Sequence, residues 1–186
     1  DMNVATTAWS PIGLNSTTGF NGKYNGNGHT ICNMQIIASG AEYAQEGTKF
    51  VEGGVENAGL FAVLGKNAVV SHLKLTNATI NCDFVNAGVV AGVNYGKINF
   101  VTVTNSIVAN SNDEATTTFI GGIAGKVVDK NVTEQEFTAR VQYSSVASTK
   151  LQAKNSGSKI IGGLVGKVDG GMIYNTFAMA DIIAVN

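Results

Sequence analysis

Three columns of apolar residues recur along this chain at fixed offsets, and this repetition restricts the fold more than any other feature. In each of four copies, one apolar residue is followed by a second five positions later and by a third after five more. The columns are Val70, Ile98, Val141 and Ile173; Leu75, Val103, Val146 and Ala178; and Ile80, Val108, Leu151 and Ile183. Such self-similarity is typical of an array of short structural units.

An incomplete copy precedes these four. Ile31 and Ile36 are also five positions apart, and we expect them to occupy the first and second columns. First-column residues are then separated by 39, 28, 43 and 32 residues, so the shortest spacing approximates the bare unit and the others contain insertions. A unit of this length, rich in Val, Ile, Gly and Asn, cannot bury its own apolar face, but it can do so by stacking on the next unit.

The pattern predicts an all-β protein, a right-handed parallel β-helix (β-solenoid) with loop insertions between its coils. Equivalent Val and Ile residues would form internal ladders, for which β-branched side chains are well suited. A β-sandwich requires hairpins, a leucine-rich repeat requires denser leucine, and a propeller is a further alternative. We expect residues 31–186 to form one continuous domain of four to five coils, and residues 1–30 to form a capping segment.

Blocks of five residues with a small residue at each end precede the columns. They are residues 58–62, 88–92, 121–125 and 162–166, and we interpret each as a short strand between two glycine corners. Asn77 and Asn105 occupy one equivalent slot, which Ser148 and Ala180 fill in later copies. Asn tolerates left-handed backbone, so this slot is a predicted corner.

Composition excludes several classes of protein. Twelve Lys and Arg against thirteen Asp and Glu give a net charge of −1, which argues against a nucleic-acid partner. No apolar run approaches the ~18 residues that a membrane-spanning helix needs. Cys32 and Cys82 form no paired CxxC motif, so they are either one disulfide or two buried thiols, of which we favour the thiols.

Neither catalytic nor cofactor motifs are evident, and we expect no enzyme, no cofactor and no metal. His29 and His72 are the only histidines, and strand alternation would point His72 in the same direction as Val70. Nine of the thirteen acidic residues fall in insertions, and the three in or beside the repeats, Asp83, Asp169 and Asp181, occupy different slots. No acidic cluster of the kind that glycoside hydrolysis needs is therefore expected. A polysaccharide lyase or hydrolase would require an acidic or basic cluster across neighbouring coils.

The insertions at 37–57 and 127–140 are the candidate partner-binding surface, because loops inserted on one face of a repeat array often carry binding. Both insertions combine aromatic and charged residues. The candidate contact residues are Glu42, Tyr43, Glu46, Phe50, Glu52, Glu134, Phe137 and Arg140. The same residues would also suit packing against the flank of the array.

Residues 162–167 and 170–178 resemble the GLUG motif, a repeat named for its Gly-Leu-hydrophobic-Gly core that is found in bacterial surface proteins, including adhesin-like proteins and immunoglobulin A peptidases. Residues 20–31 look like the leader that precedes such arrays. The resemblance implies an exported protein whose repeats form a β-solenoid, and it carries no catalytic residues. We therefore expect a non-catalytic cell-surface module, adhesive or spacing, that contacts a host or matrix protein or a glycan. The alternative is an accessory region of a surface peptidase or glycan-processing enzyme, and in either case we expect a fragment of a longer protein.

Overall fold

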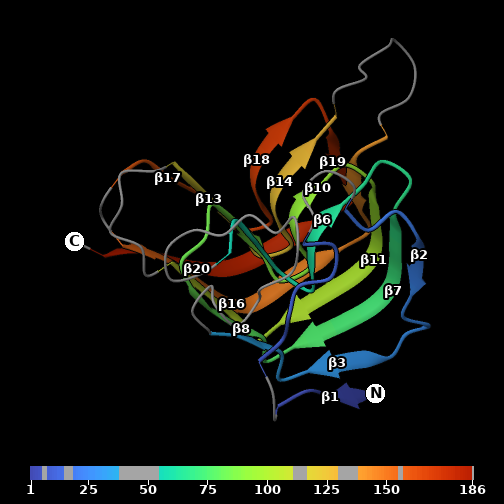
Figure 1. Ribbon diagram of the computed structural model, residues 1–186, viewed down its shortest axis with the longest axis horizontal. Coiled ribbons are helices and arrows are strands. Elements are labelled where there is room, and N and C mark those ends of the chain that lie inside the picture. The colour runs from blue at the N-terminus through green and yellow to red at the C-terminus, as the bar shows by residue number, and fades with distance from the viewer. Residues whose placement is uncertain are drawn as a thin grey trace.

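The computed structural model describes residues 1–5, 8–14, 19–37, 55–110, 117–129, 138–154 and 157–185, and every regular element among them is a strand. The strands form three sheets (Figure 1). The largest contains β1 (Met2–Asn3), β2 (Lys23–Asn25), β3 (Thr30–Cys32), β4 (Gln35–Ile36), β7 (Val69–Thr76), β8 (Thr79–Cys82), β11 (Lys97–Thr104), β12 (Ile107–Asn110), β15 (Arg140–Gln142), β16 (Ser145–Lys154), β19 (Met172–Tyr174) and β20 (Phe177–Val185).

Two smaller sheets have four strands each. One contains β5 (Asn57–Ala58), β9 (Asn86–Gly88), β13 (Thr118–Gly121) and β17 (Lys159–Gly162). The other contains β6 (Phe61–Leu64), β10 (Ala91–Asn94), β14 (Ala124–Val128) and β18 (Val165–Asp169). All pairings between these named strands are parallel, and strand neighbours come from successive sequence repeats. The expectation of an all-β protein with parallel sheets is therefore confirmed.

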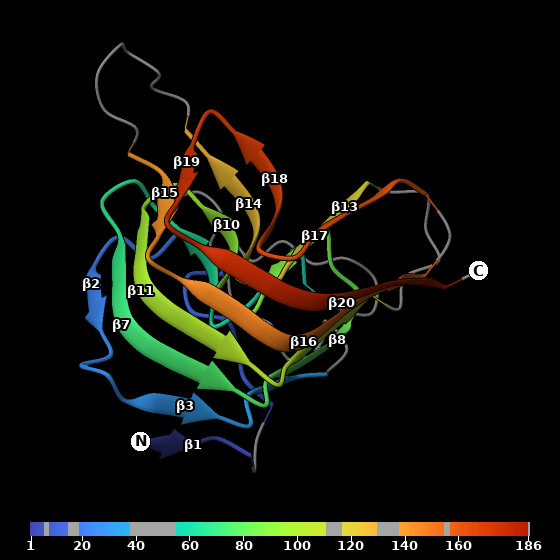
Figure 2. The ribbon, with the colours of Figure 1, turned by 180° about the vertical axis from the view of Figure 1, so that it is seen from behind.

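The strand register confirms the first two apolar columns. Ile98 lies opposite Val70 and Val141, and Val141 lies opposite Ile173. In the same way, Val103 and Val146 continue the column from Leu75 to Ala178. Figure 2 shows β7, β11, β16 and β20, which carry the second column, side by side. From the first to the third complete repeat these column residues are fully buried, so the columns line the core.

The third column differs from the sequence prediction at its last member. Leu151 lies opposite Ile182, whereas Ile183 lies opposite Gln152. The cause is a bulge in β16, where Ala147 and Thr149 oppose the consecutive residues Met179 and Ala180 and leave Ser148 between them unpaired. The assignment of Ile183 to this column was wrong by one residue.

The incomplete copy also occupies a different place from the one predicted. Ile31 lies opposite Leu75 and Ile36 lies opposite Ile80, so they belong to the second and third columns. The first-column position before Val70 is instead occupied by Tyr24 of β2, which lies opposite Val70 on the side away from Ile98. Both steps between columns are five residues long, so a copy with only two members fits either step.

The glycine blocks are bends between two strands, and not the short strands that we predicted. In one block, β13 ends at Gly121 and β14 begins at Ala124. Close packing of backbones explains the glycines, since a Cβ on Gly88 would lie 2.4 Å from Cα of Ala124, far inside contact distance. The corner slot is confirmed at Asn77, Asn105 and Ser148, which have φ angles of 55°, 50° and 49°.

Residues near the N-terminus lie along the edge of β6. The indole Nε1 of Trp9 donates a hydrogen bond to the carbonyl oxygen of Leu60, 3.2 Å away. Ile12 and Phe20 form isolated parallel bridges with Phe61 and Leu64, and the rings of Phe20 and Phe61 are 4.9 Å apart.

Both cysteines are free thiols, as favoured from the sequence. Cys82 is buried and Cys32 is half-buried. Burial, with a smaller contribution from the charge of Asp83, raises the pKa of Cys82 to about 12.

Candidate functional site

The candidate functional site is a polar pocket between the two four-stranded sheets, which diverge from the glycine bends (Figure 1). Strand alternation places its residues on the outer side of the sheets, because Lys126 and Val128 are half-buried there while Val127 between them is buried. The cavity has a volume of about 280 Å³. Its lining residues are Glu56, Asn57, Val63, Asn86, Val93, Tyr95, Lys126, Val128, Lys167 and Asp169.

One wall of the pocket is built from stacked positions of β6, β10, β14 and β18. Val63, Val93, Lys126 and Lys167 are register partners along this sheet, so the row changes from valine to lysine through the repeats. Val128 lies opposite Asp169 in the neighbouring row. The pocket therefore combines residues that lie far apart in the sequence.

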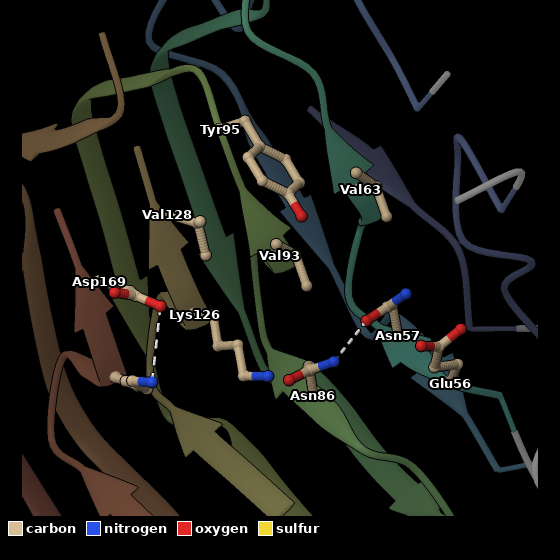
Figure 3. Close-up of a pocket in the computed structure, with 10 residues that line it drawn as sticks. Glu56, Asn57, Val63, Asn86, Val93, Tyr95, Lys126, Val128 and Asp169 are labelled. Atoms are coloured by element: carbon tan, nitrogen blue, oxygen red, sulfur yellow. Dashed lines mark hydrogen bonds and ion pairs between the residues drawn. The ribbon is translucent and has the colours of Figure 1, made fainter. Parts of the chain in front are cut away.

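The other wall carries two buried amides. Asn57 and Asn86 are register partners in β5 and β9, and they are 6% and 4% exposed. Nδ2 of Asn86 donates a hydrogen bond to Oδ1 of Asn57, 2.7 Å away (Figure 3). Oδ1 of Asn86 is itself buried and has no hydrogen-bond partner, and the same holds for Oε2 of Glu56. Two acceptors in the pocket thus lack donors, an arrangement that is costly in a buried site.

Lys126 lies between the two walls. Its Nζ atom is 4.0 Å from the centroid of the Phe119 ring, within the range of a cation–π interaction. Burial lowers the pKa of Lys126, and the positive charge of Lys167 lowers it further. In Figure 3 the Lys126 side chain lies between Asp169 and Asn86, with Glu56 beyond Asn86.

Lys167 and Asp169 form an ion pair at the open side of the pocket. Their charged atoms are 3.5 Å apart, and their side chains are 46% and 63% exposed. Exposed pairs of this kind contribute little to stability. Together with Lys126 and Glu56 they give the lining two positive and two negative charges.

This pocket was not predicted from the sequence. In the sequence, Glu56 falls in the 37–57 insertion and Asp169 lies beside a repeat, so the acidic residues appear dispersed. The structure instead brings two carboxylates and two lysines into one pocket across three repeats. No group of three or more potential metal ligands occurs within the described ranges.

Most of the candidate loop residues lie outside the described part of the chain: Glu42, Tyr43, Glu46, Phe50, Glu52, Glu134 and Phe137. Arg140 is described, and it begins β15. Its carbonyl oxygen accepts a hydrogen bond from Nδ2 of Asn94, 3.3 Å away, and its Nε atom is buried without a hydrogen-bond partner. Arg140 does not line the pocket, and the binding role of all eight residues remains a prediction.

His72 belongs to an exposed row of aromatic rings. Its φ angle of 51° turns the strand, so the side chain does not follow Val70 into the core. The rings of His72 and Phe100 stack at 5.0 Å, and those of Phe100 and Tyr143 stack at 4.9 Å. Phe100 and Tyr143 also have positive φ angles, of 55° and 49°. His29 is exposed, with Nδ1 3.6 Å from a carboxylate oxygen of Asp1.

Two known proteins are similar to part of this chain. Halomucin from Haloquadratum walsbyi is 33% identical over 119 residues, which are 64% of this chain and 1% of that protein. A putative Gly-rich membrane protein from Evansella cellulosilytica is 35% identical over 97 residues, which are 51% of this chain and 10% of that protein. No family model and no solved structure matches the chain. In the described residues there is no helix of sufficient length and apolarity to span a membrane.

Proposed function

We propose that this chain is a non-catalytic β-solenoid module of a cell-surface protein, with a role in adhesion or as a spacer. The observation that carries this proposal is the parallel register of equivalent residues through successive repeats. We infer that the three sheets are the faces of a right-handed parallel β-helix, since the chain visits them in the same order in each repeat.

Stacked parallel strands suit a spacer. Each repeat bonds its backbone to the repeats on either side, and each adds about 4.8 Å along the stack. The apolar columns run in the same direction through the core, so bending the stack would separate buried side chains. A module of this kind holds whatever it carries at a fixed distance and presents a regular outer surface.

The proposed location rests on the relatives and on the GLUG resemblance. One relative is named as a halomucin and the other as a membrane protein, names that favour a surface or membrane setting. This chain spans only a small part of either protein, so the location of the whole protein is part of the proposal.

A non-catalytic role also fits the pocket. Asp169, one of its two carboxylates, is largely exposed and paired with Lys167. A catalytic group must be held in a fixed position by its packed neighbours, and the largely exposed Asp169 is not held in this way.

The location can be tested on the full-length protein in intact cells of its source organism. We expect external protease to remove the segment without lysis, while a cytoplasmic marker stays intact. Removal only after lysis would contradict a surface location.

Adhesion can be tested by screening the purified protein against arrays of matrix proteins and glycans. We expect binding to at least one class and no release of new reducing or unsaturated ends from polysaccharides. Replacing residues 40–52 by a short Gly-Ser linker tests the first loop, and an equivalent replacement of residues 131–137 tests the second. If both variants still bind, the two loops are not the contact surface. Polysaccharide cleavage would contradict the non-catalytic role.

A further inference from the structure

We propose that the pocket between the two four-stranded sheets binds an uncharged saccharide unit. This proposal rests on the proposed adhesive function and gives it a ligand class. The pocket residues lie on the strands of the two four-stranded sheets or, as with Glu56 and Tyr95, directly beside one of these strands. The starting observation is that two buried acceptors, Oδ1 of Asn86 and Oε2 of Glu56, have no donor.

These acceptors point to a ligand that donates hydrogen bonds. Asn86 is 96% buried and is fixed by its bond to Asn57, so it cannot turn its oxygen toward bulk water without breaking that bond. Lys126, in the same pocket, is a donor only and requires an acceptor. Sugar hydroxyls meet both requirements, because each hydroxyl donates one hydrogen bond and accepts others.

The charges of the pocket favour an uncharged ligand. Lys126 and Lys167 are balanced by Glu56 and Asp169, and Lys167 already pairs with Asp169. An anionic sugar would lie close to the unpaired oxygen of Glu56, and a cationic group would lie close to Lys126. Each would meet a like charge in a partly buried site, where screening by water is weak.

The remaining lining suits the carbon face of a sugar ring. Val128 and Tyr95 are half-buried and offer the pocket an aliphatic and an aromatic surface, while Val63 and Val93, which also line it, are only 4% and 7% exposed (Figure 3). The cavity volume of about 280 Å³ is near the lower limit for small-molecule sites, so the pocket fits a short segment of a glycan.

The test uses calorimetry to measure binding of the purified protein to neutral oligosaccharides of glucose, mannose, xylose and N-acetylglucosamine. Oligosaccharides that contain uronic acid or sialic acid serve as the acidic comparison. We expect one or more neutral oligosaccharides to bind. Glu56→Gln and Lys126→Met should each weaken that binding about tenfold or more, as expected for loss of a hydrogen bond to a charged group.

Two control variants are matched to these. Asn99→Asp alters a half-buried amide whose buried Oδ1 also lacks a partner, on β11 outside the pocket. Lys97→Met removes a strand lysine that does not line the pocket. We expect both controls to bind like the parent protein, and thermal unfolding shows whether each variant is folded.

Several results would overturn the assignment. The first is that the protein binds acidic oligosaccharides alone. The second is that both pocket variants bind as well as the parent protein, and the third is that no member of the panel binds. If the pocket variants have no effect but the loop replacements abolish adhesion, the saccharide pocket is wrong while the proposed adhesive function stands. If neither set of variants affects adhesion, both sites are excluded.

Discussion

Asn86 and Asn57 lie opposite each other in neighbouring strands, and the amide of Asn86 donates a hydrogen bond to the side-chain oxygen of Asn57. The bond joins two successive repeats through side chains, in addition to the backbone ladder. Because both residues are buried, each depends on the other for a polar partner.

A double-mutant cycle on this pair should show strong coupling. Asn86→Ala leaves Oδ1 of Asn57 buried without its donor, so we expect a loss of about 1–3 kcal/mol in the free energy of unfolding. The Asn57→Ala, Asn86→Ala double variant should lose less than the sum of the two single variants, because it leaves neither partner orphaned. Urea unfolding of all four proteins checks this, and additive losses would contradict the coupling.

Gly88→Ala should destabilise the protein strongly. The new Cβ would lie 2.4 Å from the backbone Cα of Ala124, so two strands must move apart, at a cost of about 1–3 kcal/mol or more. Gly163→Ala is the matched control, since its Cβ would meet no backbone atom and only the side-chain Cβ atoms of Ala178, at 3.0 Å, and Ala180, at 3.9 Å. Chemical unfolding should rank Gly88→Ala well below Gly163→Ala, and equal losses would show that the bend is not closely packed.

Stability should fall in alkaline solution because of Cys82. Its pKa rises from 9.0 to about 12 on folding, so between these pH values the unfolded thiol loses its proton while the folded thiol keeps it. The unfolded state then binds fewer protons, and stability decreases as pH rises through this window, by at most about 1.4 kcal/mol per pH unit.

The measurement for Cys82 compares the pH dependence of unfolding in the parent protein and in Cys82→Ala. The variant should lack this part of the slope between pH 9 and the upper limit of the folded protein. Alkylation of the native protein should also modify Cys32 before Cys82, because only Cys82 is buried. Identical slopes would contradict the prediction.

Removing Lys167 should raise the pKa of Lys126. The positive charge of Lys167 is the second cause of the lowered pKa of Lys126, after burial, whereas the charge of Asp169 acts in the opposite direction. Lys167→Met removes the repulsion and frees Asp169 from its ion pair, so both changes have the same sign. NMR titration of ¹³C-methylated lysines, with Lys126→Met to assign the signal, measures the shift, and a downward shift would contradict this account.

The inner side of the molecule could be predicted from the sequence better than its outer side. The columns that begin at Val70, Leu75 and Ile80 could be recognised in the sequence, because every repeat must place an apolar residue at each buried position. Ile31 was misplaced because its only spacing, five residues, occurs twice in the pattern.

The pocket was not predictable in the same way. Its outer positions change from Val63 and Val93 to Lys126 and Lys167, because residues outside the core are not constrained by stacking. Their proximity depends on the strand register and on the angle between two sheets. Glu56 reaches the pocket because it precedes β5, at Asn57–Ala58. This strand contains none of the apolar column residues, so the repeat pattern did not predict its position.

The unpaired Ser148 shows how an array of repeats accommodates change in its own length. One strand has a residue more than its neighbour across this corner, yet pairing continues on both sides of it, from Ser145 opposite Phe177 to Ala153 opposite Ala184. An insertion or deletion of one residue is therefore absorbed where it occurs and does not disturb the strands beyond it. Adjacent repeats can diverge in size one residue at a time while the protein keeps a continuous interior.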